Sequence, residues 1–324
     1  MNQPKITREK VRLSVIVLFY HGERWIRKCV RSLETQSLSR TSYEIILVDN
    51  GGTTPSVKKY DGQPNIQVLC FAENLGFAGG NNMALAHAEG ELVLLINQDV
   101  EAHFNCLAEL IAAFEGCPQA GIISANMFMV SLGDDIDPHC SAGSTVGLYR
   151  LTALGYASYF IKETNERILA AEFVSGNGLC FRRIILEDVG HYLFDDRLGS
   201  YAEDLDLSIR LKKTKWEMYV CPQAIVYHYR DEAFSGSPAH LLKKLFKVSS
   251  NRLLVYFNNL TFRKFLIKLP ALSLGICLKV AKPDGARGFN LFNFFVALGC
   301  TPLIFAYFGL RVFRLSKTQL QKAD

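Results

Sequence analysis

The amino-acid sequence predicts an α/β fold. We expect a doubly wound, mostly parallel sheet with helices on both faces, followed by a basic, apolar helical C-terminal tail. Continuous apolar runs alternate with helical patterns through the first hundred residues, which is typical of strands buried on both faces. Each run ends abruptly in small or polar residues. Residues 241–324 contain 14 Lys and Arg against two acids, a net charge of +12, whereas residues 1–240 carry a net charge of −7.

The first hundred residues predict four central strands joined by helical crossovers. The first crossover places Trp25, Ile26, Cys29, Val30 and Leu33 on one face, as in an amphipathic helix. The second begins at Thr54-Pro55, which resembles an N-cap followed by proline at the first helical position. Crossovers between parallel strands are right-handed. The expected strands are residues 13–20, 43–48, 66–71 and 92–96, and further helices are expected over 78–88 and 103–115.

Several classes of protein are excluded by absent motifs. No G-x-G-x-x-G follows the first strand and no P-loop motif occurs, so neither dinucleotide binding nor a P-loop NTPase is expected. The nine cysteines are scattered singly, without a C-x-x-C pair, which indicates cytoplasmic thiols and not a disulfide framework or a zinc site. The polar first twelve residues lack the apolar core of a signal peptide.

Two of the apolar runs are followed closely by a carboxylate, Asp49 and Asp99. In open α/β sheets, ligands bind just outside the carboxyl ends of the strands. A carboxylate also cannot be buried without a partner at low cost. Both residues have a structural alternative: Asp99 as the N-cap of the helix near residues 103–115, and Asp49 as a turn residue before Gly51-Gly52.

Five motifs then follow in order, and they resemble the signatures of glycosyltransferase family 2. The resemblance is strongest to rhamnosyltransferase-like enzymes that build bacterial surface polysaccharides, and it spans roughly residues 12–230. The motifs are VDNG at 48–51, NLGFAGGNN at 74–82, LINQD at 95–99, VSGNG at 174–178 and EDLDLSIR at 203–210. This family resemblance implies a GT-A type fold and transfer of a sugar from a nucleotide diphosphate donor.

The leaving diphosphate of such a donor requires neutralisation, usually by a divalent cation held by carboxylates. Mg²⁺ or Mn²⁺ is the expected cofactor, and Asp99 is the expected metal ligand. The resemblance adds His228 as a second ligand, with a purely structural histidine as the alternative. The first position of the D-x-D motif is Asn97, whose amide oxygen coordinates a metal more weakly than a carboxylate does.

The donor nucleotide is expected at the tips of the first strands. By resemblance, Asp49 hydrogen-bonds the N3–H of a uracil or thymine base, and Asn74 and Gly76 lie near the nucleotide. Phe19 is a candidate to flank the base, although an aromatic side chain on a buried strand is more often part of the core.

The acceptor side is expected to provide a general base. Inverting transfer needs a carboxylate that takes the proton of the acceptor hydroxyl. The resemblance implies Asp204 in this role, with Glu203 as the second candidate and Asp206 as an anchor of the helix or a nearby loop. The alternative is helix capping, because acids at a helix N-terminus are stabilised by its dipole.

The basic tail predicts contact with an anionic membrane surface and not with nucleic acid, because its charges are interleaved with Leu, Phe and Ile. An ordinary solvated helical subdomain is the alternative. The 23 uncharged residues 288–310 are long enough for one span, so a single-span and a peripheral arrangement both stay open. We therefore predict a glycosyltransferase domain over 1–238, with a nucleotide-binding half near 12–125 and an acceptor half near 126–238. A membrane-associating region follows over 239–324.

The predicted function is transfer of rhamnose or a similar sugar from a dTDP- or UDP-sugar to a lipid-linked or polysaccharide acceptor. The predicted location is the cytoplasmic face of the bacterial inner membrane. Two rivals remain. A nucleotidyltransferase would carry a Gly-rich loop with a basic residue after the first strand, which Phe19-Tyr20-His21-Gly22 does not resemble. A non-catalytic, membrane-bound assembly partner would retain the fold, and Asn97 keeps this alternative open.

Overall fold

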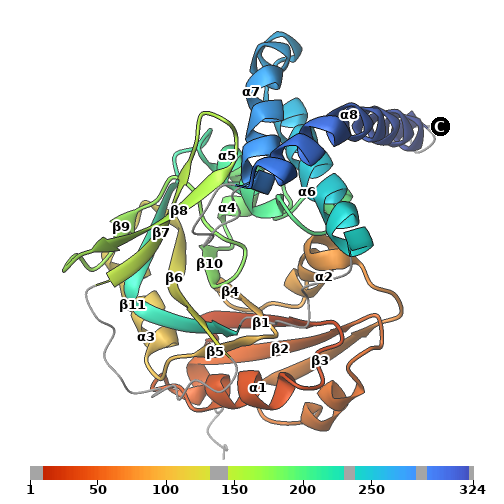
Figure 1. The fold of residues 1–324 in the computed structure, drawn as a ribbon. Coiled ribbons are helices and arrows are strands. Elements are labelled where there is room, and N and C mark those ends of the chain that lie inside the picture. The colour runs from red at the N-terminus through yellow and green to blue at the C-terminus, as the bar shows by residue number, and fades with distance from the viewer. Residues whose placement is uncertain (1–9, 132–144, 230–237, 282–289, 321–324) are drawn as a thin grey trace, which may run out of the picture. The chain divides into compact units, whose positions relative to one another are not determined.

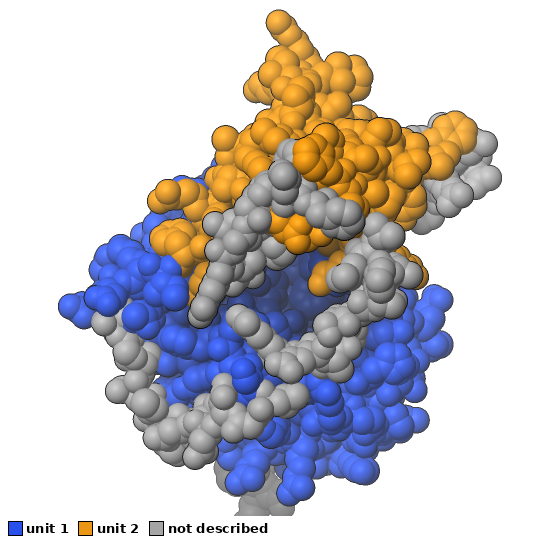
Figure 2. Space-filling model, viewed as in Figure 1, with its two compact units in different colours: residues 1–148, 161–231 blue, residues 149–160, 232–324 orange. Residues whose placement is uncertain are grey.

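The computed structural model describes residues 10–131, 145–229, 238–281 and 290–320. The chain divides into two compact units (Figure 2): residues 1–148 with 161–231, and residues 149–160 with 232–324. This division falls near the predicted domain boundary at residue 238. The sequence had no signal that residues 149–160 belong with the C-terminal unit.

The nucleotide-binding half contains the four predicted strands, all parallel, in the order β3-β2-β1-β4 (Figure 1). Their registers align Phe19 with Asp49 and Leu18 with Asn97, so the carboxyl ends of β1, β2 and β4 share one edge. The four strands are β1 (Leu13–Phe19), β2 (Tyr43–Asn50), β3 (Ile66–Phe71) and β4 (Leu92–Asn97).

Both faces of this sheet are covered, as the continuous apolar runs predict. Val15 and Val17 of β1 belong to a core cluster shared with α1 (Ile26–Glu34) and α3 (Cys106–Gly116). Ile16, between them, belongs to a second cluster shared with α2 (Gly76–Leu85) and α5 (Glu203–Leu211). Alternate side chains of one strand therefore enter opposite cores. The predicted mostly parallel, doubly wound arrangement is confirmed for this half.

The remaining strands make the sheet mixed. β10 (Leu179–Arg182) lies antiparallel between β4 and β6 (Ala120–Val130). β11 (Glu217–Tyr229) runs parallel to β6, and β5 (Val100–Ala102) pairs antiparallel with β11. β11 is a single strand with an irregularity between Cys221 and Ile225.

The expected crossover helix after Thr54 is only a short 3-10 helix, η2 (Pro55–Tyr60), without a capping bond from the Thr54 side chain. The smaller elements complete the first unit and the hairpin that leads out of it. They are η1 (Arg40–Ser42), β7 (Thr145–Leu151), β8 (Ala157–Glu163), β9 (Leu169–Ala170), α4 (Ile185–Asp188) and η3 (Asp196–Leu198).

The C-terminal unit is mainly helical, as predicted. Its helices are α6 (Pro238–Asn259), α7 (Phe262–Ala281, with Pro270 inside) and α8 (Leu291–Leu320, with Pro302 inside). Within the described ranges, α8 alone includes a segment that satisfies the length and composition of a membrane span, the 19 residues Phe295–Phe313. The predicted span over 288–310 begins three residues before α8, and its first two residues lie outside the described residues.

Candidate active site

The two predicted metal ligands lie in contact. Nε2 of His228 is 3.2 Å from Oδ1 of Asp99, and both side chains are about one-fifth exposed, at 21% and 22%. The pairing of β5 with β11 sets this contact, because it places His228 opposite Val100, the residue after Asp99. The backbone N–H of Tyr229 also donates to the carbonyl of Asp99 at 2.9 Å.

The alternative role of Asp99 as a helix N-cap is wrong. The residue that precedes α3 is Asn105, and β5 separates it from Asp99. The Nδ1 atom of His228 is buried and has no hydrogen-bond partner among the residues that the structure describes, so Nε2 is the nitrogen directed at Asp99. A carboxylate oxygen and an imidazole nitrogen are suitable ligands for Mg²⁺ or Mn²⁺ when donor phosphates and water supply the rest. The described residues contain no cluster of three or more His, Cys, Asp or Glu side chains that could hold a metal.

A short segment, Ser175–Gly178, connects the end of β4 with the start of α5. Oδ1 of Asn177 accepts a hydrogen bond from the N–H of Asn97 at 3.1 Å. The N–H of Gly176, one residue earlier, donates to Oδ2 of Asp204 at 3.3 Å. A Cβ atom at Gly176 would lie 3.1 Å from the Phe77 ring, so a side chain there would crowd the start of α2. The predicted metal-binding edge and the predicted base are therefore joined through two adjacent residues.

The two candidate bases differ in burial. Glu203 is only 7% exposed, whereas Asp204 is half-buried and accepts hydrogen bonds from Gly176 and from the N–H of Leu205. Both stand in the first turn of α5, as the sequence predicts. Asp204 is therefore the more accessible of the two carboxylates.

The backbone just before α5 has an unusual conformation. Tyr201 and Ala202 are consecutive non-glycine residues in the left-handed region, with φ of 76° and 69°. Each such residue is strained unless the surroundings hold it there. Burial, and then the neighbouring Glu203 carboxylate, raise the pKa of the Tyr201 phenol, so this side chain stays protonated at neutral pH.

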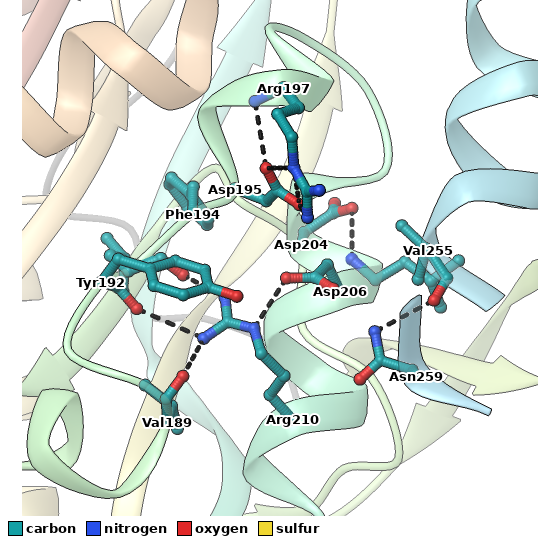
Figure 3. Close-up of polar contacts among 12 residues, drawn as sticks. Val189, Tyr192, Phe194, Asp195, Arg197, Asp204, Asp206, Arg210, Val255 and Asn259 are labelled. Atoms are coloured by element: carbon teal, nitrogen blue, oxygen red, sulfur yellow. Dashed lines mark hydrogen bonds and ion pairs between the residues drawn. The ribbon is translucent and has the colours of Figure 1, made fainter. Parts of the chain in front are cut away.

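Asp206 anchors the neighbouring loop, as predicted. Its Oδ2 accepts from Nε of Arg210 at 2.7 Å, and both side chains are largely buried. The guanidinium of Arg210 also donates to the carbonyls of Val189 and Leu193 and lies over the Tyr192 ring (Figure 3). This group fixes the loop before η3 against the helix that carries Asp204.

Two of the predicted donor-binding residues, Asp49 and Phe19, are buried and have structural contacts. Asp49 is 2% exposed, and its Oδ1 accepts from the N–H groups of Thr53 and Thr54, so it also has the turn role that the sequence allowed. Phe19 is fully buried in the core beside α1, the more common role for such a side chain, and in this conformation it has no surface with which to stack on a base.

Asn74 and Gly76 belong to a tightly held turn before α2. Oδ1 of Asn74 accepts from the N–H of Gly76 at 2.8 Å and from the side chain of Asn50 at 3.0 Å. Gly76 has φ of +72°, and an added Cβ would lie 2.7 Å from the carbonyl oxygen of Gly199. The Gly199 carbonyl also accepts from the N–H of Ala78 at 2.8 Å. This turn therefore packs against the loop that precedes α5.

Three amides with important contacts were not predicted. Asn50 is 1% exposed and also accepts from the N–H of Leu75. Gln98 forms two hydrogen bonds with the backbone of Tyr20, at 2.8 and 3.0 Å, and so ties the end of β1 to the end of β4. Asn177 holds Asn97. All three lie inside the five motifs. Their position next to an apolar run is the feature of the sequence from which they could have been predicted.

Known proteins resemble this chain in sequence and fold. The family model "Glycosyl transferase family 2" matches residues 14–190. An N-acetylglucosaminyl-diphospho-decaprenol L-rhamnosyltransferase of Mycobacterium tuberculosis is 27% identical, covering 70% of this chain and 79% of that protein. The poly(ribitol-phosphate) β-N-acetylglucosaminyltransferase TarS of Staphylococcus aureus is 36% identical over 93 residues, or 28% of this chain and 16% of TarS.

Two solved structures share the fold. TarS residues 1–349 in complex with UDP-GlcNAc superpose with a TM-score of 0.55 at 20% identity, covering 91% of this chain and 81% of that one. GalNAc-T7 with UDP, GalNAc and Mn²⁺ gives a TM-score of 0.59 at 14% identity, covering 76% and 47%. The chain spans less than a quarter of the length of two curated relatives, 23% and 16%. The fold is of the GT-A type, and the chain belongs to glycosyl transferase family 2.

Proposed function

We propose that the protein is an inverting, metal-dependent glycosyltransferase. It transfers rhamnose or a similar hexose from a dTDP- or UDP-sugar to a hydroxyl group of a lipid-linked glycan in cell-surface polysaccharide synthesis. The observation that carries this proposal is the Ser175–Gly178 segment, which hydrogen-bonds both to the end of β4 at Asn97 and to the Asp204 carboxylate. Donor and acceptor chemistry would then take place on two sides of one short backbone segment.

Asp99 and His228 would hold the divalent cation. Their 3.2 Å contact and partial exposure support this role, and Mg²⁺ and Mn²⁺ normally take few protein ligands. The Mn²⁺ bound in GalNAc-T7, which shares the fold, also supports it. When bound, the cation would neutralise the charge that develops on the leaving diphosphate. Asn97 would leave Asp99 as the sole carboxylate of the DxD-like position.

Asp204 would act as the general base. The acceptor hydroxyl gives its proton to the Asp204 carboxylate while its oxygen forms a bond to the anomeric carbon, and the bond from that carbon to the diphosphate breaks. The partly exposed position of Asp204, compared with the buried Glu203, favours this choice. Asp206 and Arg210 would keep α5 in place during the reaction.

The donor and acceptor classes are supported by the relatives. TarS binds UDP-GlcNAc, and the mycobacterial relative is named for rhamnosyl transfer to a diphospho-decaprenol lipid. Asp49, Asn74 and Gly76 would lie along the nucleotide, and Asp49 would read the pyrimidine through its carboxylate. The basic, apolar tail would keep the enzyme at the cytoplasmic face of the inner membrane, where a lipid-linked acceptor is found.

A panel of dTDP- and UDP-sugars tests the proposal. The full-length protein is incubated with each donor, with Mn²⁺ or with EDTA, and release of nucleoside diphosphate is measured. We expect metal-dependent release with at least one donor, and strongly reduced release by Asp204→Asn and Asp99→Ala. Wild-type-like release by either variant would remove that residue from the mechanism. No release with any donor would favour a non-catalytic assembly partner.

A further inference from the structure

The outward face of α8 is a long apolar stripe in the C-terminal unit. Its large side chains are between 43% and 61% exposed, and they recur at helical spacing. The helix carries no charge from Leu291 through Leu310. The stripe consists of Phe295, Leu298, Leu303, Tyr307, Leu310 and Phe313. Isolated exposed apolar residues are common, but a continuous stripe of this length indicates an interaction surface.

The opposite face of α8 is packed against the other two helices of the same unit. Ala297 and Ile304 are completely buried. Thr301 lies beside Cys277 of α7, with 3.8 Å between Oγ1 and Sγ. The Phe308 ring lies 6.1 Å from Phe265 of α7 and 5.8 Å from Phe257 of α6. The helix is therefore two-sided, with one face in a protein core and the other largely exposed, although the Tyr307 ring at its edge lies 6.4 Å from Phe246 of α6.

Length alone would allow residues 295–313 to cross a bilayer, because 19 helical residues extend about 28 Å. The packed face opposes this arrangement. Arg311 lies inside the segment, and its Nη1 donates to Ser250 at 2.8 Å and to Asn251 at 2.5 Å, both fully buried on α6. Crossing would carry this charge and its polar partners to hydrocarbon depth, which is unfavourable.

A second charge would be carried into the membrane with α7. The contacts at Phe265 and Cys277 place the part of α7 between them, which includes Lys268, beside residues 301–308 of α8. That stretch includes the middle of the candidate span. Nζ of Lys268 donates to the carbonyl of Ala153 at 3.3 Å, a backbone partner that lowers but does not remove the cost of a charge at hydrocarbon depth. An orientation in the plane of the surface avoids this cost, because the charge then stays near the lipid headgroups.

The charge of the unit fits an anionic surface. Between Ala233 and Ala323 the sequence contains a single acid, Asp284. Exposed basic side chains stand on α6 and on the first turn of α7, at Lys243, Lys244, Lys247, Arg263 and Lys264. Basic residues beside apolar ones bind interfaces through both acyl-chain burial and attraction to anionic headgroups.

We propose that α8 lies in the plane of an anionic membrane surface, with its exposed stripe turned toward the acyl chains, and that it does not cross the bilayer. The exposed stripe thus contacts a lipid surface and not a second copy of this chain. This proposal specifies the membrane association proposed above and does not depend on the chemistry of sugar transfer.

Flotation of the full-length protein with vesicles tests the stripe. We expect binding to mixed phosphatidylglycerol–phosphatidylcholine vesicles and much weaker binding to pure phosphatidylcholine or at high salt. The double variant Leu303→Glu/Leu310→Glu should lower the vesicle partition coefficient at least about tenfold, because two leucines that would insert among the acyl chains are replaced by charged residues. The control Ile184→Glu changes an equally exposed residue of the first unit, where Ile184 is 53% exposed, and should bind like the wild type.

The orientation is tested by extraction of cell membranes with alkaline carbonate, which releases peripheral proteins and retains spanning ones. Release of the wild-type protein supports an in-plane helix. Retention in the membrane would overturn the proposal, and so would unchanged vesicle binding by the double variant. A dimer in solution that the double variant dissociates, without vesicle binding, would make the stripe a protein interface and would also overturn it.

The two proposals can fail separately. The double variant should keep the wild-type rate of nucleoside diphosphate release, because neither leucine belongs to the candidate active site. A wild-type protein that binds vesicles but releases no nucleoside diphosphate would contradict the enzyme assignment and leave the membrane surface intact.

Discussion

Nε2 of His228 lies 3.2 Å from Oδ1 of Asp99. One residue stands near the end of β11 and the other just after β4, and the three-residue strand β5 brings them together. The pairing of a very short strand with the edge of a long one therefore sets the contact on which the proposed cation site depends. Because Asp99 and His228 lie on different strands or strand ends, each can be replaced by itself to test its role.

Replacement of either residue should weaken the binding of the metal ion. We expect Asp99→Asn to lower kcat/KM by about a hundredfold or more, because the carboxylate proposed to hold the cation is lost. His228→Ala should mainly raise the Mn²⁺ concentration needed for half-maximal activity, by about tenfold. Titration of Mn²⁺ in a nucleoside diphosphate release assay measures both. An unchanged Mn²⁺ requirement in His228→Ala would leave the histidine with a structural role only.

Asp204→Asn should affect the chemical step more than donor binding. Loss of a general base typically lowers kcat by about 10²–10⁴-fold. Donor affinity, measured by calorimetry, should stay close to that of the wild type. Glu203→Gln is the matched control, since Glu203 is buried in the same helical turn. If Glu203→Gln loses more kcat than Asp204→Asn while remaining folded, the roles of the two acids are reversed.

Asn177→Ala should destabilise the end of β4. It removes the acceptor of the Asn97 N–H, and an unsatisfied backbone donor costs about 1–3 kcal/mol. Asn177→Asp retains an acceptor oxygen at that position and should recover most of the loss. Urea unfolding of the three proteins gives the comparison. Equal destabilisation by both substitutions would show that the hydrogen bond to Asn97 contributes little.

Gly76→Ala should be much more damaging than Gly52→Ala. Both glycines have positive φ, 72° and 68°, so each substitution carries about 1–2 kcal/mol of backbone strain. Only at Gly76 would the new methyl group meet another backbone, at 2.7 Å from the Gly199 carbonyl oxygen. We therefore expect a further loss of about 1–3 kcal/mol for Gly76→Ala and a lower thermal midpoint. Equal midpoints for the two variants would mean that the turn at Gly76 and the loop at Gly199 move apart easily.

Thiol chemistry should distinguish the buried Cys29 and Cys106 from the exposed Cys70. Burial raises the pKa of the Cys29 and Cys106 thiols, so both stay protonated in the folded protein well above pH 9. The unfolded chain ionises them near their usual pKa of about 8.5. Stability should therefore fall as the pH rises above about 9, because the unfolded state then releases more protons.

A thiol reagent applied to the folded protein at pH 8 should label Cys70, which is exposed, much faster than Cys29 or Cys106. Rapid labelling of all three would indicate that the first unit opens readily. Chemical denaturation at pH 8 and at pH 10 checks the alkaline loss of stability, with Cys29→Ala as the matched variant.

The strands of the nucleotide-binding half were predictable because a continuous apolar run between polar turns leaves few alternatives. The acids at the strand tips were predictable for a similar reason, since Asp49 and Asp99 interrupt such runs. Family resemblance then supplied the roles of Asp204 and His228. These roles remain predictions, although the geometry places His228 beside Asp99.

Other features depended on contacts between distant parts of the chain. The antiparallel strand β10 is four residues long and follows a glycine-rich segment, so it carries no clear periodic signal. Asn50, Gln98 and Asn177 bind backbone groups in distant loops, and local sequence does not indicate those partners. The 3-10 helix after Thr54 was mistaken for a helical crossover because Thr-Pro is typical of both.

The position of β10 has a consequence for synthesis of the chain. β4 is apolar from Leu92 to Ile96, and one of its edges is covered only by β10, which follows it by more than eighty residues. While the nascent polypeptide emerges from the ribosome, that edge stays open until residue 182 has been made. Unpaired apolar edges are templates for aggregation. Fragments that stop near residue 130 should therefore accumulate as inclusion bodies, whereas fragments that extend past β11 should remain dispersed.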